Sequence, residues 1–203
     1  MCDCLKSSNQ LVNTMMYVGA KAPAQYDPQS EFNGAKIVYI PTHIPGISHI
    51  PALLELAKQG DKICVYFHGN ACDISQVSYI ANHESSKLNA HYLILEYPGY
   101  GIARGKSTEE TVRQLALDAY TFIESKLRIP SDRVVILGRS IGTGPACYLA
   151  AELSKRGQPP AALVLHSPYS SIRDLTIDLV IIKTVHRKIS NEKVDRLLFE
   201  PIS

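Results

Sequence analysis

The sequence predicts an α/β fold, with a mostly parallel sheet and helices on both faces. The first observation is a set of apolar runs that end in turn residues, the pattern of strands buried in a parallel sheet: residues 62–70, 91–101, 133–138 and 161–170. The second is helical periodicity over residues 107–127 and again after Ser140. Strands that alternate with helices in this way indicate a mostly parallel sheet.

The N-terminal part of the chain has a different character. Residues 1–33 are polar and irregular, and Pro23 and Pro28 argue against regular structure there. We assign residues 34–203 to one α/β domain. Its first two apolar stretches, residues 35–41 and 48–56, flank a short turn and predict an antiparallel pair of strands.

Both predicted helices carry end signals. Ser107 and Glu110 have the spacing of a capping box at the start of the first helix, and Pro130 follows its end. Gly157 has the position of a C-terminal cap on the second helix.

The composition is that of an ordinary soluble globular protein. The 203 residues are 45% hydrophobic and 20% charged, with a formal net charge of +2. Lys and Arg are scattered, so we expect no nucleic-acid partner. No apolar run approaches the roughly 18 residues of a membrane span, and the N-terminus lacks the apolar core of a secretory signal. We therefore expect a cytoplasmic protein with reduced cysteines.

The stretch Gly138-Arg139-Ser140-Ile141-Gly142 is the strongest functional signal. It has the pattern G-x-S-x-G and lies between a buried strand and a helix, where a nucleophilic serine is lifted above the sheet on a strained turn. Glycines at 138 and 142 remove side chains that would collide with the neighbouring strand and helix. The start of the helix directs N–H groups toward a developing oxyanion. We interpret Ser140 as a nucleophile.

The alternative interpretation of this stretch is a glycine-rich turn that binds phosphate at a helix N-terminus. Gly142 and Gly144 are compatible with it. The dinucleotide pattern, however, requires a third glycine where Cys147 stands, and no lysine follows as in a P-loop. The nucleophile is therefore favoured.

An oxyanion hole needs a second donor, from the loop after an earlier parallel strand. His68-Gly69-Asn70-Ala71 has this position, and Gly69 allows close approach of the backbone. The amide of Asn70 or Ala71 would act together with that of Ile141. A plain strand-ending turn is the alternative.

Four motifs in fixed order carry a resemblance to a known family: "VYFHGNACDI", "LILEYPGYG", "ILGRSIGTGPA" and "LVLHSPYSS". Over about residues 34–175 the chain resembles serine hydrolases of the alpha/beta-hydrolase superfamily, in the branch with depalmitoylating, palmitoyl-protein thioesterase-like members. The resemblance implies the alpha/beta-hydrolase fold and hydrolysis of an acyl thioester or ester, through an acyl-enzyme on Ser140. The implied substrate is an acylated protein or a small ester, and no cofactor or metal is expected.

The remainder of a catalytic triad is expected to be missing. In this family an Asp or Glu follows the next strand and a His follows the last strand. The chain reaches Ser203 before either can be identified, so we expect a fold that is incomplete at its C-terminus. Asp174 or Asp178 with His186 has the right order, but the spacing is too short for residues delivered by separate strands.

Two other histidines, His68 and His166, stand at predicted strand ends. We expect His166 to be structural and His68 to orient its loop. Without the histidine of a triad, turnover falls about a millionfold, so the chain as it stands is expected to be close to inactive. The alternative to an incomplete hydrolase is a noncatalytic binding or regulatory module.

Cys2 and Cys4 carry the last prediction. In the resembled family, N-terminal cysteines are S-acylated and hold the protein at membranes. We therefore predict Cys2 and Cys4 as candidate acylation sites for peripheral membrane association, against the alternative of an unmodified tail. Position 2 is not glycine, which excludes N-myristoylation.

Overall fold

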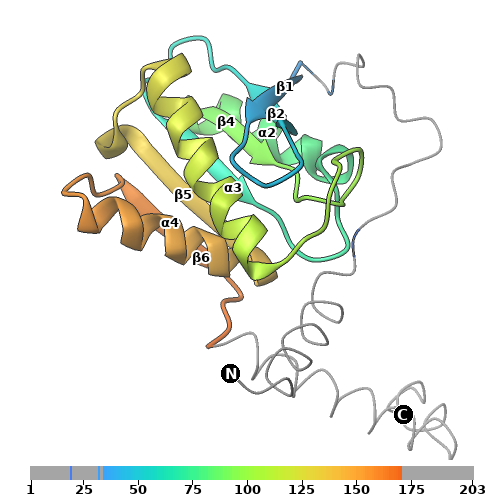
Figure 1. Ribbon diagram of the computed structural model, residues 1–203. Helices are drawn as coiled ribbons and strands as arrows, with labels where there is room; N and C mark the ends of the chain where they lie inside the picture. The colour runs from blue at the N-terminus through green and yellow to red at the C-terminus, as the bar shows by residue number, and fades with distance from the viewer. Residues whose placement is uncertain (1–18, 20–31, 33, 171–203) are drawn as a thin grey trace, which may run out of the picture. The chain divides into compact units, whose positions relative to one another are not determined.

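The computed structural model describes residues 19, 32 and 34–170, which contain a six-stranded sheet and three α-helices. The strands are β1 (Lys36–Pro41), β2 (His49–Glu55), β3 (Ile63–Phe67), β4 (His91–Leu95), β5 (Val134–Arg139) and β6 (Ala162–His166). The α-helices are α2 (Ile74–Leu88), α3 (Glu109–Phe122) and α4 (Thr143–Lys155). Figure 1 shows their arrangement.

The sheet has the strand order β1-β2-β4-β3-β5-β6. The antiparallel pair predicted at the start of the domain is confirmed as β1 and β2, and β2 also runs antiparallel to β4. From β4 onward every neighbouring pair is parallel. The carboxyl ends of these four strands therefore lie along one edge, where ligands bind in open α/β sheets.

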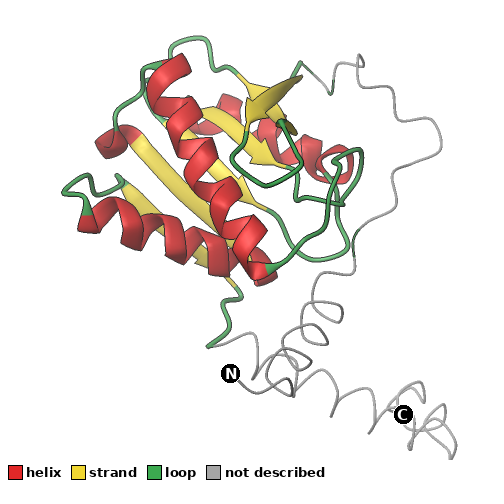
Figure 2. Ribbon diagram, viewed as in Figure 1, coloured by secondary structure: helices red, strands yellow, loops and turns green. Residues whose placement is uncertain are grey.

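Helices cover both faces of the sheet, as predicted (Figure 2). Alternate residues of a strand point to opposite faces. In β3, Val65 and Phe67 pack into the core beneath α3 and α4, whereas Cys64 and Tyr66 pack on the side of α2. All five residues of this strand are buried, which explains why it reads as a continuous apolar run.

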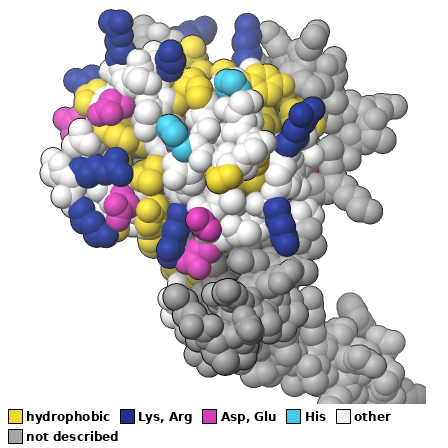
Figure 3. Space-filling view, viewed as in Figure 1, with side chains coloured by type: hydrophobic (Ala, Val, Ile, Leu, Met, Phe, Trp, Pro, Cys, Tyr) yellow, Lys and Arg dark blue, Asp and Glu magenta, His cyan; other side chains and the backbone are white. Residues whose placement is uncertain are grey.

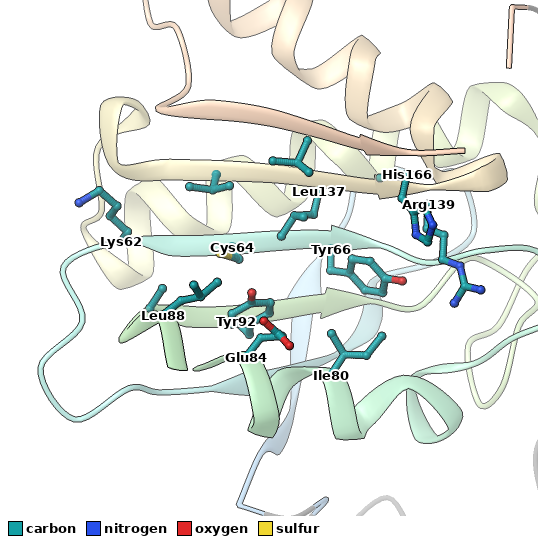
Figure 4. A pocket seen from close by; sticks show the side chains of 14 residues that line it. Lys62, Cys64, Tyr66, Ile80, Glu84, Leu88, Tyr92, Leu137, Arg139 and His166 are labelled. Carbon is teal, nitrogen blue, oxygen red and sulfur yellow. The ribbon is translucent and has the colours of Figure 1, made fainter. Parts of the chain in front are cut away.

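The face that carries α2 also has a groove of about 680 Å³. Its apolar wall includes Leu137 of β5 and Ile80 of α2, which Figure 4 shows on opposite sides of it. Arg139 and His166 line it at the carboxyl ends of β5 and β6, where they are register partners. The groove thus extends along the sheet to the residue just before Ser140.

Two details of the helices differ from the prediction. The capping box at the start of α3 is formed by Thr108 and Thr111, not by Ser107 and Glu110, because the Ser107 hydroxyl donates to the carbonyl of Pro98 (2.7 Å). A π-helical turn, Ile123–Leu127, follows the α-helical part. Helix α4 ends as predicted, since Gly157 adopts a φ of +72° just after it.

Helix α2 was absent from the sequence-based prediction. Its apolar periodicity is weak, because polar residues such as Ser78 and Ser85 occupy buried positions. A capping box of Asp73 and Gln76 starts it. Asn89 follows its end in the left-handed conformation. These end signals are visible in the sequence and could have identified the helix.

Several predictions lie outside the described residues. Residues up to Pro168 form one compact unit, and a second begins at Tyr169. The candidate acylation sites Cys2 and Cys4, and the candidate residues Asp174, Asp178 and His186, are not described. Among the described helices none has the length and apolar character needed to cross a membrane. The described cysteines, Cys64, Cys72 and Cys147, are free thiols.

Charged side chains are distributed over the surface that Figure 3 presents. Lys and Arg appear as separate groups on this face and are not gathered into one basic patch. In the described part of the chain, no group of three His, Cys, Asp or Glu side chains is arranged to hold a metal ion.

Candidate active site

Ser140 lies on a sharp turn between β5 and α4. Its φ is +52°, in the left-handed region that non-glycine residues rarely adopt. A single 3-10 turn, Ser140–Gly142, follows the strand before α4 begins. The buried hydroxyl of Thr143 donates to the carbonyl of Ser140 (2.7 Å) and fixes the turn from the helix side. This strained strand-turn-helix geometry is that of a nucleophile elbow.

Positions 138 and 142, which flank Ser140 on either side, are crowded, and this explains why both are glycine. A Cβ atom on Gly142 would lie 2.2 Å from the carbonyl oxygen of Phe67 and 2.7 Å from that of His68. A Cβ atom on Gly138 would lie 2.7 Å from Thr143 Cα and 2.8 Å from Ala146 Cβ. Real Cβ atoms do not approach other atoms this closely, so a side chain at either position would force the turn, β3 or α4 to shift.

The loop after β3 lies directly against Ser140. The register Phe67↔Gly138 brings the ends of β3 and β5 side by side. A Cβ atom on Gly69 would lie 3.9 Å from the Cβ of Ser140. The structure therefore brings together the two segments predicted to form an oxyanion hole, residues 68–71 and the elbow.

Within this loop, Asn70 and Ala71 have different environments. The amide of Ala71 donates to Asn70 Oδ1 (2.9 Å), and Ala71 has a φ of +57°. The hydroxyl of Tyr100 also donates to Asn70 Oδ1 (2.7 Å). Burial raises the pKa of Tyr100 to about 12, which keeps this donor protonated at neutral pH. The amide of Ala71 is thus engaged within its own loop, and both Asn70 and Ala71 stay predicted second donors.

Backbone strain concentrates at the same edge of the sheet. Five described non-glycine residues have positive φ. Asn89 and Arg128 are helix caps, where this conformation is common. Ala71, Ser140 and Ser167 instead follow the carboxyl ends of β3, β5 and β6. Such strain persists where the surrounding structure enforces it, and it clusters at functional sites.

His68 is buried beneath the loop and is not placed to be the base of a triad. Its side chain and that of Glu96, at the end of β4, are both 0% exposed. Its Nδ1 atom lies 2.9 Å from the carbonyl oxygen of Gly69, and its Nε2 atom lies 3.3 Å from Glu96 Oε1. Both ring nitrogens thus face groups other than Ser140. The expectation that His68 orients its loop agrees with these contacts.

Glu96 is the residue of the site whose role the sequence did not suggest. It directly follows the last residue of β4. Burial raises the pKa of this carboxyl group, an effect that the neighbouring His68 partly opposes. An acidic residue at the end of an otherwise apolar run, "YLILE", is the signal that could have found it.

Comparisons with known proteins find relatives that are named as alpha/beta hydrolases and lipases. The chain is 35% identical over 107 residues to alpha/beta hydrolase domain-containing protein 17B of Homo sapiens, a match that covers 53% of this chain and 35% of that protein. It is 35% identical over 113 residues to lysophosphatidylserine lipase ABHD12 of Danio rerio, covering 55% and 29%. The matches therefore span about a third of the length of these relatives. No family model matches the chain.

Solved structures show the same fold. An alpha-beta hydrolase from Vibrio vulnificus superposes with a TM-score of 0.58 at 22% identity, over 68% of this chain and 47% of that one. The carboxylesterase EstE1, cloned from a metagenomic library, superposes with a TM-score of 0.53 at 18% identity, over 79% and 53%. At these identities the likeness concerns the fold alone.

Proposed function

Because the chain has the alpha/beta-hydrolase fold, we propose that it is the nucleophile-bearing part of a serine hydrolase. The reaction is hydrolysis of an acyl thioester or ester through an acyl-enzyme on Ser140. The observation that carries this proposal is the positive φ of Ser140, on a turn whose two flanking glycines leave no room for a Cβ atom without a shift of the neighbouring backbone. A turn that only connected a strand to a helix would have no need of a strained serine.

The chemistry follows from the position of Ser140. Its Oγ attacks the acyl carbon while its proton passes to a general base, and the carbonyl oxygen becomes an oxyanion. The amides of Ile141 and of Asn70 or Ala71 are the proposed donors to this oxyanion, and one such donor contributes about a hundred- to a thousandfold in rate. Collapse releases the protonated thiol or alcohol, and water then hydrolyses the acyl group from Ser140.

The general base is proposed to come from outside the described residues. The buried ring of His68 is directed to Gly69 and Glu96, and so it does not fill this role. A histidine after a later strand, oriented by an acid, is the arrangement that the fold uses. Accordingly, we propose activity for a polypeptide that also carries this pair.

The substrate class rests on the family resemblance and on the relatives. Depalmitoylation of S-acylated proteins is the finer form of the proposal. Support for acyl substrates in general comes from the names of a relative, a lysophosphatidylserine lipase, and of a structural neighbour, a carboxylesterase. Peripheral membrane association through acylated Cys2 and Cys4 would place the enzyme near such substrates.

A fluorophosphonate probe tests the proposal, because it reacts only with an activated serine. In the full-length polypeptide the probe should attach to Ser140, and the Ser140→Ala variant should remain unlabelled. Ser167 is a matched control, since it also has a positive φ at a strand end. The Ser167→Ala variant should keep the label. Equal labelling of the protein and its Ser140→Ala variant would end the proposal, and a folded full-length protein without label would favour the noncatalytic module.

A further inference from the structure

Glu96 contacts both ends of the loop that carries the proposed oxyanion donor. At the start of the loop its Oε1 atom lies 3.3 Å from His68 Nε2. At the end of the loop its Oε2 atom accepts a hydrogen bond from the amide of Ile74 (3.2 Å), the first residue of α2. One carboxyl group at the end of β4 therefore bridges the end of β3 and the beginning of α2, with residues 69–73 between the two contacts.

The position of the hydrogens at His68 follows from its partners. A carbonyl oxygen only accepts, so the Nδ1 atom that faces Gly69 carries a hydrogen. The Nε2 and Oε1 atoms are buried, and neither has a hydrogen bond of good geometry, to the other or to any further group. A lone pair facing a carboxylate would be repulsive, so this contact is favourable only with one proton held between Nε2 and Oε1.

Two tyrosines from the segment after β4 hold the same loop. The hydroxyl of Tyr97 donates to the carbonyl of His68 (2.7 Å), and the rings of these residues stack with centroids 4.2 Å apart. The hydroxyl of Tyr100 holds the Asn70 side chain. Glu96 is the one residue of this group that reaches both ends of the loop.

The space around Glu96 leaves the carboxyl group little freedom. A Cβ atom on Gly101 would lie 2.3 Å from Glu96 Oε2. Gly101 also has a φ of +47° and so turns the chain closely over the carboxyl group. The Glu96 side chain is therefore fully buried, with the backbone of Gly101 packed closely against its carboxyl group.

We propose that Glu96 is a positioning residue that clamps both ends of the loop 68–74 and so holds this loop, with its proposed oxyanion donor, beside Ser140. This inference rests on the proposed function for its purpose, but the clamp itself is a property of the loop. The clamp contains one proton, held between His68 Nε2 and Glu96 Oε1.

The charged and titratable groups that face the pair come from each neighbouring element. Asp73 stands at the N-cap of α2 with a buried Oδ2 atom that has no hydrogen bond, and its charge disfavours a carboxylate on Glu96. Tyr97 and Tyr100 face it from the segment after β4. Burial, the largest effect, raises the pKa of Glu96. A raised pKa means that the clamp holds its proton at low pH and loses it as the pH rises through the folded pKa.

Hydrogen exchange of the loop amides tests the clamp without any need for turnover. In the Glu96→Ala variant of the full-length polypeptide, exchange in peptides covering residues 68–74 should accelerate about tenfold, as expected for the loss of a hydrogen bond to a charged or shared-proton group. Peptides from α3 should exchange at the unchanged rate. Glu109→Ala removes an exposed carboxylate from the start of α3 and should leave the loop unaffected.

The Glu96→Gln variant provides a second hydrogen-exchange test of the clamp. Its amide group can donate to His68 Nε2 and accept from Ile74, so at neutral pH the exchange of the loop should stay within about twofold of the unsubstituted protein. As the pH rises, protection of the loop should fall in the unsubstituted protein and remain level in Glu96→Gln, after correction for intrinsic exchange. This comparison tests whether Glu96 clamps the loop even when the Glu96→Ala variant does not fold.

Two results would overturn the clamp. One is unchanged loop exchange in a folded Glu96→Ala variant, and the other is a Glu96→Gln variant whose loop titrates as the unsubstituted protein does. Failure of the proposed function looks different, because Ser140 would then remain unlabelled by the fluorophosphonate while the exchange results still supported the clamp.

Discussion

Replacing Gly142 by alanine should destabilise the protein for a purely steric reason. The backbone of Gly142 has a φ of −67°, which alanine adopts without strain. The added methyl group would, however, lie 2.2 Å from the carbonyl oxygen and 2.6 Å from the carbonyl carbon of Phe67, and 2.7 Å from the carbonyl oxygen of His68. All three are backbone atoms at the end of β3, so relief requires the strand end and the elbow to move apart.

The cost follows from this geometry. Overpacking in a well-filled site costs about 1–3 kcal/mol, and the contact with rigid backbone places Gly142→Ala at the upper part of that range. For a domain of this size, each kcal/mol lowers the midpoint of thermal unfolding by about 2–4 °C. We therefore expect the midpoint to fall by about 5–10 °C.

Gly69→Ala is the matched control. Its Cβ atom would meet only ordinary van der Waals neighbours, 3.9 Å from the carbonyl oxygen of Arg139 and from Ser140 Cβ. Unfolding by urea, followed by circular dichroism, should place Gly69→Ala within about 0.5 kcal/mol of the unsubstituted protein, as for a substitution without steric conflict. An equal loss of stability in both variants, or none in Gly142→Ala, would refute the steric account of the elbow.

Three further predictions concern other parts of the fold. Burial disfavours ionisation of Asp118, but hydrogen bonds from the β1–β2 turn outweigh this effect and lower its pKa, so the stability it contributes is present at neutral pH and lost as the pH falls through the folded pKa. Asp118→Asn should lower the unfolding free energy at pH 7 by about 1.5–3 kcal/mol and flatten its acid dependence, and an unchanged acid limb in urea titrations would contradict this assignment. Tyr100→Phe removes the donor to Asn70 and should cost about 1 kcal/mol in the same assay; no loss would show that the bond does not contribute. Iodoacetamide should modify exposed Cys147 well before buried Cys64, whose pKa burial raises, and peptide mapping that found Cys64 modified first would be incompatible with its position in the core.

The sheet was predictable because strands that are buried on both faces need apolar residues at nearly every position. Strand β3 is apolar throughout, and the antiparallel opening pair is marked by its turn. The position of Ser140 on its turn was predictable for a related reason, since glycine is the residue that fits at 138 and 142 without a steric conflict. In each case a local requirement, burial of a strand or lack of space for a Cβ atom, determines the residue type.

Features that depend on contacts distant in the sequence could not be predicted. The start of α3 shifted by one residue because the hydroxyl of Ser107 is taken by the carbonyl of Pro98. The two contacts of Glu96 reach His68 and Ile74, which lie 28 and 22 residues away along the chain. Only the parallel pairing of β3 and β4 brings these groups together, and the sequence does not report that register.

The most direct test of the central claim is to trap the acyl-enzyme. The full-length polypeptide is incubated with a long-chain acyl thioester, quenched in acid and mapped by mass spectrometry. We predict that the acyl mass appears on the peptide that contains Ser140, and that both the adduct and thioester hydrolysis disappear in Ser140→Ala. Continued hydrolysis by the Ser140→Ala variant, or an adduct confined to another residue, would contradict the assignment of Ser140 as the nucleophile.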